Sequence, residues 1–305
     1  MPTSAMRRIT VGRIAMPKLR WLLLVMPLLM AQDYGSGVAQ VGGVWGSPPA
    51  AAGGATDFTE DANCVGAWFI DSTDPDDIVD DCGGDDSLGA GESIGTPAVS
   101  VTTPGTTPAG YRSIETDATG DYYARANDAA FDADPFTACA WGMVGNGQGG
   151  DDIFRSSNDG AGPGWGINQA HGAGIWGNVH SSGTSGATTI NNDTWFHACM
   201  SYNDTASGPG VENTIYVYHD GEEDCSGACT VADGKNTASG DGLSWLAQSD
   251  GGNSCSSGDV TCLLHESVYF DRQLTKYEIC EICRFGVRGD VTDRDALCGS
   301  CDYTP

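Results

Sequence analysis

Short segments rich in β-branched and aromatic residues recur along most of the chain, separated by Gly, Asn and Asp. Two sets of side chains alternate inside several of them. In residues 213–220, Ile215 and Val217 point to one side; Tyr216 and Tyr218 point to the other. This pattern predicts antiparallel strands. The predicted strands are residues 64–70, 111–117, 121–126, 136–144, 151–157, 164–170, 173–179, 194–203, 213–220, 243–249 and 262–272.

The regular spacing of these segments predicts an all-β fold, a two-sheet antiparallel sandwich. Tight turns should join the strands, as at Asp220-Gly221. In the last predicted strand, Leu264, Val268 and Phe270 are expected to share one face. Glu266 would be the one polar member of that face.

One short helix is predicted, over residues 274–285, where Leu274, Tyr277 and Ile282 form an apolar stripe. Gly286 follows it and supplies a stop signal. We expect the apolar stripe to pack against the sandwich.

The N-terminal region has the features of a secretory signal. Residues 1–20 carry five basic residues and no acid, and an eleven-residue apolar run, Trp21–Ala31, follows with one interruption at Pro27. Such a run is too short to cross a membrane as a helix but fits a signal peptide, with an uncleaved anchor as the alternative. The predicted organisation is a signal peptide at 1–39, a flexible lead-in at 40–62, the sandwich at 63–289 and a Cys-stapled tail at 290–305.

Within the sandwich region, the stretch from residue 87 to residue 110 is rich in Ser, Thr, Gly and Pro and has no Lys or Arg. We expect a long surface loop with little regular structure there.

Charge and cysteine content restrict the partners and the compartment. The chain has 14 Lys and Arg against 41 Asp and Glu, a formal net charge of −27. Binding to nucleic acid or to an anionic membrane surface is disfavoured, because a polyanion would be repelled at each approach. The even count of 12 cysteines behind a secretory signal predicts a secreted or cell-surface protein with paired thiols and no membrane span in the mature chain.

The spacing of the cysteines suggests how they pair. Three pairs are close enough in sequence for a disulfide to close a single loop. A fourth disulfide would join two strands in distant parts of the sandwich. These pairs are Cys64–Cys82, Cys225–Cys229, Cys255–Cys262 and, between the strands, Cys139–Cys199.

The tail carries a C-x2-C-x14-C-x2-C pattern, formed by Cys280, Cys283, Cys298 and Cys301. This spacing is typical of tetrathiolate zinc sites. In an oxidising compartment thiols pair unless metal is loaded first, so two disulfides are favoured and zinc is the alternative. Either outcome ties the last residues to the predicted helix.

The order of these segments resembles that in laminin-G-like members of the concanavalin A-like lectin/glucanase superfamily. The segments are FTACAWGMV (136–144), GWGINQA (164–170), TWFHACMSYN (194–203), NTIYVYHDG (213–221) and HESVYFDRQLTKYEI (265–279). The most specific piece is the closing signature, made by Arg272, Leu274, Thr275, Glu278 and Ile279. The resemblance covers about residues 63–289 and implies a jelly roll of two antiparallel sheets.

The sequence lacks the acids that hydrolysis in this superfamily uses. Its glucanases place paired acids on one strand as Glu-x-Asp-x-x-Glu, and this triplet does not occur here. Glu222-Glu223-Asp224 follows a turn, and Glu92 is isolated. We therefore expect an exported, non-catalytic carbohydrate-binding or adhesion protein that recognises glycan or a glycan-coated surface. A hydrolase with differently spaced carboxylates and a purely structural surface or particle protein are the alternatives.

Three tryptophans are the best candidates for a sugar-binding face. Trp165, Trp176 and Trp245 have Gly or Ser neighbours, which places them nearer to loops than the other large aromatic residues. Core packing is the alternative for each of them.

A cluster of acids offers a second kind of site. Eight aspartates fall within sixteen residues, and oxygen ligands at this density can bind calcium. They are Asp71, Asp74, Asp76, Asp77, Asp80, Asp81, Asp85 and Asp86. Asp80 and Asp81 are the favoured ligands because they lie nearest the first strand, and a solvated acidic surface is the alternative. The spacing does not match an EF-hand loop.

Overall fold

Two antiparallel sheets make up the protein, and most side chains between them are apolar. The computed structural model describes residues 55–299, with gaps at 77, 83–91, 95–96, 106–109, 117–120, 126–128, 146–150, 159–161, 170–173, 180–181, 204–212, 226–228, 232–241, 247–260, 292–293 and 295. The predicted signal peptide lies outside these residues.

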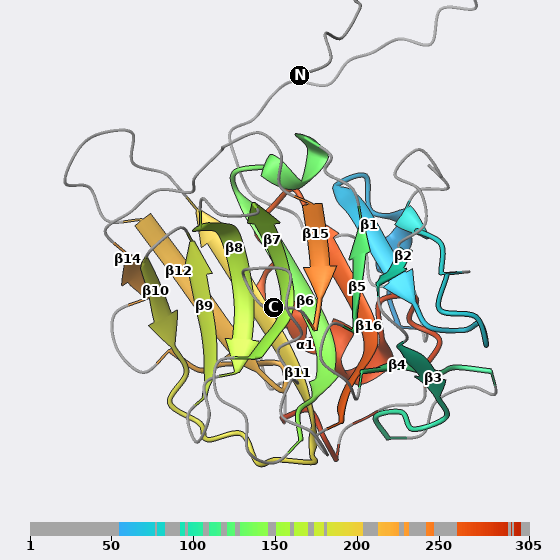
Figure 1. The fold of residues 1–305 in the computed structure, drawn as a ribbon. Helices are drawn as coiled ribbons and strands as arrows, with labels where there is room; N and C mark the ends of the chain where they lie inside the picture. Colours follow the sequence, from blue (N-terminus) through green and yellow to red (C-terminus); the bar gives the residue numbers. More distant parts are fainter. Residues whose placement is uncertain are drawn as a thin grey trace, which may run out of the picture. The chain divides into compact units, whose positions relative to one another are not determined.

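The larger sheet has nine strands (Figure 1). Seven lie side by side in the order β13 (Glu222–Glu223), β12 (Asn213–His219), β11 (Trp195–Asn203), β6 (Phe136–Met143), β16 (Cys262–Phe270), β4 (Ser113–Thr116) and β3 (Ala98–Ser100). The other two are β1 (Cys64–Phe69), which pairs with β16, and β14 (Thr230–Val231), which pairs with β12.

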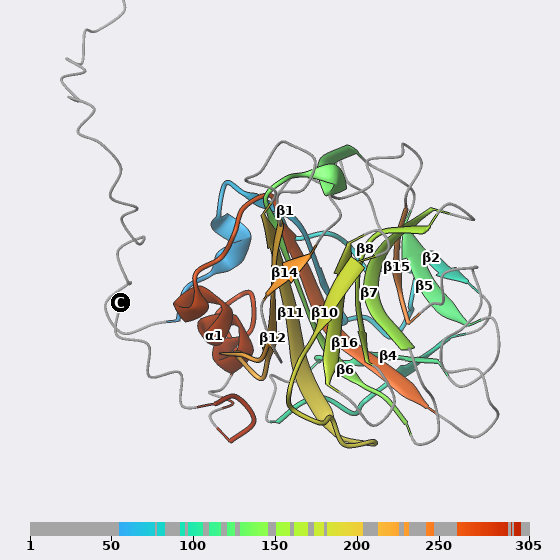
Figure 2. The same ribbon diagram turned by 90° about the vertical axis from the view of Figure 1, so that its left-hand side faces the viewer.

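The second sheet has seven strands, in the order β10 (Ser182–Ser185), β9 (Ile175–Val179), β8 (Gly162–Gln169), β7 (Asp151–Asn158), β15 (Gly242–Trp245), β5 (Tyr122–Arg125) and β2 (Glu92–Ile94). Two short 3-10 helices, η1 (Phe58–Glu60) and η4 (Ala129–Asp132), and one α-helix, α1 (Lys276–Phe285), complete the described elements. Figure 2 shows α1 on the outer side of the nine-stranded sheet, with the seven-stranded sheet on the opposite side of the sandwich.

The predicted two-sheet sandwich is confirmed, and each predicted strand is present with ends shifted by a few residues. Strands β2, β3, β10, β13 and β14 are not predicted by the sequence pattern. Two of them, β2 and β3, fall in the stretch that was expected to be a loop, so that expectation is wrong for these residues. Each of these two strands has three residues, which is too few to show the alternation on which strand prediction depends.

Aromatic rings dominate the core between the sheets. Trp68 and Trp245 lie edge to face at 4.9 Å between ring centroids, and Phe154 stacks on Trp245 at 5.2 Å. Trp165 stacks on Tyr269 at 5.4 Å, which joins one sheet to the other. Offset and edge contacts of this kind add to the burial of apolar area that holds the two layers together.

Strand β16 departs from simple alternation. Its pairing with β6 shifts register between Leu264 and Ser267. Leu264 therefore belongs to the core between the sheets, whereas Val268 and Phe270 belong to the cluster under α1. The prediction that these three side chains share one face is wrong, because the irregularity exchanges the two faces.

The contacts at the start of helix α1 explain why the closing signature has these residues. Thr275 is the N-cap, and its side chain and that of Glu278 form a capping box. Arg272 donates to both Glu278 and Asp61, with 2.7 Å from Nη2 to Glu278 Oε1. Gly286 ends the helix at a φ of 76°. Leu274 and Ile279 are buried against the outer face of the nine-stranded sheet.

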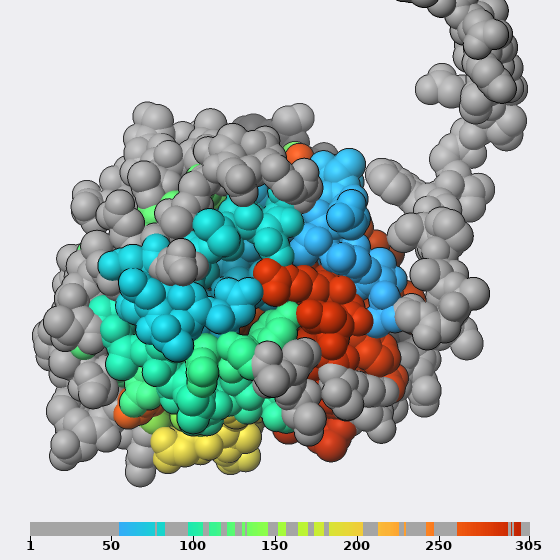
Figure 3. All heavy atoms as spheres, turned by 90° about the vertical axis from the view of Figure 1, so that its right-hand side faces the viewer, coloured from blue at the N-terminus to red at the C-terminus, as the bar shows by residue number. Residues whose placement is uncertain are grey.

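The described part of the predicted lead-in, residues 55–62, is not a loose segment. Phe58 is 2% exposed and packs against Phe270 at 6.4 Å between ring centroids. Its backbone N–H donates to the carbonyl of Val287 at 2.8 Å. The prediction of a flexible lead-in is therefore wrong for these residues. Figure 3 shows the C-terminal residues packed beside this N-terminal segment.

A buried ion pair fixes the C-terminal segment to the sheet. Arg294 Nη1 donates to Glu266 Oε1 at 2.9 Å, and the two side chains are 0% and 2% exposed. The same guanidinium lies over the Trp141 ring at 4.9 Å and contacts His265 Nε2 at 3.2 Å. Glu266 is thus the partner of a buried cation, which explains a buried carboxylate in this strand.

Disulfides link several of these elements, and the described residues hold no free cysteine. The predicted bonds Cys64–Cys82, Cys139–Cys199 and Cys225–Cys229 are present, together with Cys283–Cys298. Cys139 and Cys199 are paired neighbours on β6 and β11, so this bond lies within one sheet and does not join distant parts of the sandwich. Cys262 and Cys280 are also disulfide-bonded; Cys255 and Cys301 lie outside the described residues.

Among the described residues, no helix is both long and apolar enough to span a membrane.

Candidate functional site

Polar and aromatic side chains gather on the outer face of the seven-stranded sheet, across strands β7, β8 and β9. Asn168 pairs with Trp176 on one side and with Asp152 on the other. Side chains of directly paired residues point to the same face of a sheet. In the same way, Gly166 on β8 pairs with Asn178 on β9 and with Arg155 on β7, so these two side chains are also on that face. We call Asp152, Arg155, Asn168, Trp176 and Asn178 the outer-face cluster.

An irregularity in β7 brings two of these residues together. Residues three apart in a regular strand face opposite sides of the sheet. The pairing of β7 with β8 shifts register between Asp152 and Phe154, and Ile153 and Phe154 both enter the core. Asp152 and Arg155 are consequently on the same face, where Arg155 Nη1 donates to Asp152 Oδ2.

The carboxylate of Asp152 is held by two donors. In addition to the Arg155 guanidinium, Asn168 Nδ2 donates to Asp152 Oδ1 at 2.5 Å. Asp152 is 6% exposed. Burial raises the pKa of Asp152, and the charge of Arg155 and the two hydrogen bonds oppose that rise.

Several polar atoms of the cluster are buried without a hydrogen-bond partner in the described part of the chain. They are Nε and Nη2 of Arg155, Oδ1 of Asn168 and Oδ1 of Asn178. A buried polar group left unpaired costs about 1–3 kcal/mol. A ligand that supplies two acceptors and two donors here would recover that cost on binding.

Trp176 is the aromatic member of the cluster and is 46% exposed. Its indole lies across Gly183 of β10, where an added Cβ would come within 1.9 Å of Trp176 Nε1. Gly166 similarly leaves room beside Asn178, whose Oδ1 would be 3.0 Å from a Cβ at that position. Glycine at these two positions lets the indole and the amides lie flat on the sheet.

The other two tryptophans proposed for a sugar face are in the core. Trp165 and Trp245 are 0% exposed, and Trp245 Nε1 donates to Ser267 Oγ at 2.8 Å. A fully buried indole offers no face to a sugar, so the prediction for these two residues is wrong. Their small neighbours, Gly166 and Ser244, occupy the outer positions of the same strands, and the indoles occupy the inner ones.

Four members of the cluster were not predicted as site residues: Asp152, Arg155, Asn168 and Asn178. Asn168 and Asn178 each stand next to a buried apolar residue, Ile167 and Val179, and Asn178 is two positions from Trp176, so alternation places both amides on the outer face, which is a usable signal. The meeting of Asp152 with Arg155 depends on the register shift in β7, which the sequence pattern does not show.

The favoured calcium ligands are engaged by other groups. Asp80 Oδ1 accepts from the backbone N–H of Ala67 at 2.9 Å and of Cys82 at 3.0 Å. Burial raises the pKa of Asp80 to about 6, against these hydrogen bonds. Asp81 forms an ion pair with Arg288. A calcium ion needs six to eight oxygens, roughly, and this pair offers few that are free, so calcium binding stays a prediction.

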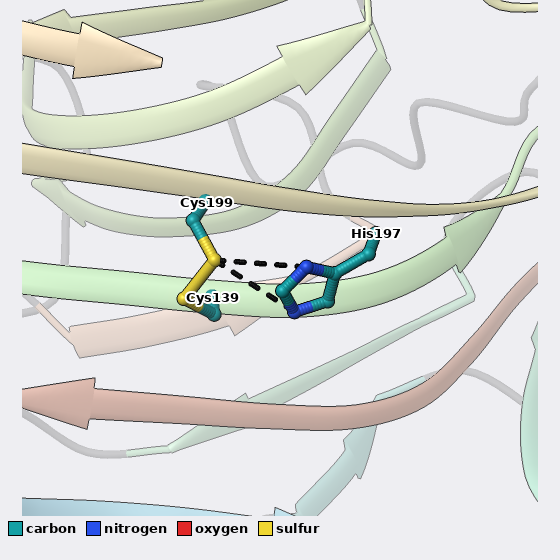
Figure 4. A group of neighbouring side chains, drawn as sticks. All are labelled: Cys139, His197 and Cys199. Atoms are coloured by element: carbon teal, nitrogen blue, oxygen red, sulfur yellow. Dashed lines mark hydrogen bonds between the residues drawn. A yellow bond between two sulfur atoms is a disulfide. The ribbon is translucent and has the colours of Figure 1, made fainter. Parts of the chain in front are cut away.

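The tail cysteines act as disulfide sulfurs. Because Cys283 is bonded to Cys298, neither is a thiolate in this structure, and zinc binding by the four tail cysteines would require that this bond be absent. The same holds for a second group with metal-ligand spacing, Cys139, His197 and Cys199 (Figure 4). His197 Nε2 lies 3.7 Å from Cys199 Sγ, and burial lowers the pKa of this histidine to about 3.

The acids that follow the Asp220-Gly221 turn have structural partners. Glu223 forms an ion pair with Lys276, and Asp224 Oδ1 accepts from Thr188 Oγ1 at 2.8 Å. The turn itself is confirmed, with φ of 51° at Asp220 and 82° at Gly221.

The two layers and their strand order define the class of protein, an antiparallel jelly-roll sandwich. A family model described as Concanavalin A-like lectin/glucanases superfamily matches residues 117–280, and the chain belongs to this family. No curated protein sequence matches the chain.

Solved structures share the fold at low sequence identity. Trypanosoma rangeli sialidase is similar with a TM-score of 0.52 and 13% identity, over 74% of this chain and 33% of the sialidase chain. The binding domain of botulinum neurotoxin DC in complex with SialylT is similar with a TM-score of 0.47 and 10% identity, over 73% of this chain and 51% of that chain. At 13% identity the likeness to the sialidase concerns the fold alone.

Proposed function

We propose that the protein is an extracellular, non-catalytic glycan-binding protein that binds its ligand on the outer-face cluster. The observation that carries this proposal is Trp176, the exposed indole among the described tryptophans, set beside amide and guanidinium groups with unpaired polar atoms. An aromatic ring can stack on the apolar face of a sugar, and the neighbouring polar groups can bond its hydroxyls. Disulfides in the sandwich and the tail are compatible with an oxidising compartment.

A catalytic role is the weaker proposal. The family description names both lectins and glucanases, so both are open to a member. A retaining glycosidase needs two carboxyl groups about 5 Å apart flanking the bond. In the outer-face cluster the one carboxylate, Asp152, is held by Arg155 and Asn168. We therefore expect no release of reducing sugar from any glycan that the protein binds.

The test compares two exposed aromatic residues on opposite sides of the sandwich. A glycan array selects a ligand, and titration calorimetry then measures its affinity for wild type, Trp176→Ala and Tyr277→Ala. Tyr277 is 38% exposed and lies on α1, over the other sheet. We expect Trp176→Ala to weaken binding at least about tenfold, as loss of a stacking tryptophan typically does, and Tyr277→Ala to have no effect.

Two outcomes would contradict the proposal. Equal losses in both variants would place binding elsewhere, and binding to no glycan on the array would favour a structural spacer. Repeating the titration after removing calcium with a chelator tests the predicted assistance by calcium, which requires a loss of affinity that added calcium restores.

A further inference from the structure

Arg155 lies at the β7 side of the outer-face cluster and uses only part of its hydrogen-bonding capacity. It lies on β7, between Gly166 of β8 and Ser244 of β15, and is 2% exposed. Nη1 is bonded to Asp152. Nε and Nη2 are buried and have no partner within the residues that the structure describes.

These two nitrogens form one edge of the guanidinium. Their N–H groups are parallel and lie in one plane, so together they match the two oxygens of a carboxylate. A sugar hydroxyl supplies a single acceptor oxygen to that edge. The unfilled edge therefore favours a planar anion with two oxygens over a neutral group.

We propose that the glycan bound by the outer-face cluster carries a carboxylate, which Arg155 binds through Nε and Nη2. This inference rests on the proposed function, because Trp176 holds the sugar ring that carries the acid. The ligand class is an acidic sugar, such as a uronic or ulosonic acid.

The charge of the whole chain opposes an anionic ligand, so recognition of one depends on a local cation. A net charge of −27 repels any anion at long range. A preference for a carboxylated sugar over its neutral counterpart then requires a local cation. In the outer-face cluster that cation is Arg155. Because its guanidinium is covered in the free protein, the groups above it must move before the acid arrives, and association should be slower than for an open site.

The experiment uses matched ligands that differ at one group. Affinities of the full protein are measured for oligogalacturonate and for a sialylated lactose, each against its carboxyl-reduced counterpart and against a sulfated neutral oligosaccharide. For at least one of the carboxylated sugars, we expect binding at least tenfold tighter than for the reduced form and for the sulfated sugar.

Two variants separate the carboxylate contact from folding. Arg155→Gln removes the charge and leaves Asp152 without its cation. Arg155→Lys keeps a positive charge beside Asp152 but has no two-donor edge, and thermal unfolding reports whether it is folded. Both variants should bind acidic and reduced sugars equally. Arg284→Gln, which removes a positive charge from α1 over the other sheet, is the matched control and should keep the preference for the acid.

The inference is overturned if wild type binds acidic and reduced sugars equally, if the sulfated sugar binds as tightly as the carboxylated one, or if folded Arg155→Lys keeps the full preference. The proposed function fails separately, when none of these sugars binds or when Trp176→Ala leaves all affinities unchanged. Equal binding of both forms that is lost in Trp176→Ala would retain the function and reject the carboxylate.

Discussion

At the scale of single residues, buried polar groups in this protein fall into two kinds. Asp80 and Glu266 are buried carboxylates with protein donors, and they hold strands or tail in place. Arg155 and Asn168 keep unpaired polar atoms on the outer face of the sheet. Asp80 Oδ2 and Glu266 Oε2 are also buried without a partner, so the unpaired atoms of the outer face point to a site only because they lie beside the exposed indole of Trp176.

The raised pKa of Asp80 makes a prediction about stability. Its folded pKa of about 6 exceeds its ordinary value of 3.8, so its contribution to stability is fully present below about pH 4 and is lost as pH rises through 6. Asp80→Asn keeps the acceptor Oδ1 and removes the charge. At pH 7.5 the gain of about 3 kcal/mol is partly offset by about 1–2 kcal/mol for the unpartnered Nδ2.

Urea unfolding of Asp80→Asn between pH 4 and pH 8 measures this effect. We expect a net gain of about 1–2 kcal/mol at pH 7.5 and none at pH 4. Asp74→Asn, in the exposed part of the same acidic loop, is the control and should change little. A variant less stable than wild type at pH 7.5 would contradict the assignment, and would favour Asp80 as a calcium ligand if chelation removed the difference.

At the scale of elements, the closing signature is a connection between the last strand and the helix. Arg272 bridges Glu278 and Asp61, and Thr275 caps the helix. Thr275→Ala should cost about 1 kcal/mol in unfolding free energy through the lost cap. Arg272→Ala should cost about 2 kcal/mol, because it leaves the carboxylates of Asp61 and Glu278 without their cation.

Chemical unfolding measures both losses. Lys276→Ala provides the control, since its ion pair with Glu223 is on a side chain that is 48% exposed, and it should stay within about 0.5 kcal/mol of wild type. Losses as small in Arg272→Ala as in Lys276→Ala would show that the signature is not a structural connection.

The C-terminal segment depends on one buried pair. Arg294→Met leaves the Glu266 carboxylate in a site that is 2% exposed, without its cation. Breaking such a pair typically costs about 3–5 kcal/mol. The double variant Arg294→Met with Glu266→Leu should recover most of the loss, and a thermal unfolding series on the four proteins checks this. No recovery would mean that the cost comes from packing against Trp141.

Strand prediction from the sequence succeeded where aromatic and β-branched residues alternate, as in β12, and failed for very short strands such as β2 and for β10, which contains only Ser, Thr and Gly. The helix was predicted from its apolar stripe and the Gly286 stop, whereas the capping box of Thr275 and Glu278 was not predicted. Of the site, the sequence identified Trp176 alone. Arg155 was out of reach because a register shift, set by tertiary packing, turns it toward Asp152.

At the scale of the whole molecule, the two outer faces of the sandwich have different roles. The nine-stranded sheet is covered by α1 and the disulfide-linked C-terminal segment, which bury Val268 and Phe270. The seven-stranded sheet carries Trp176 and the polar groups of the outer-face cluster on its outer side. One face is thus used for stability, and the other is available for a ligand.

The most direct measurement is nuclear magnetic resonance of indole-labelled protein during titration with the glycan selected on the array. The chain has 8 tryptophans, each with one indole N–H signal. The signal of Trp176, identified from its loss in Trp176→Ala, should move as glycan is added, while those of the buried Trp165 and Trp245 stay in place. A bound glycan that leaves the Trp176 signal unmoved would contradict a binding site on the outer face of the seven-stranded sheet.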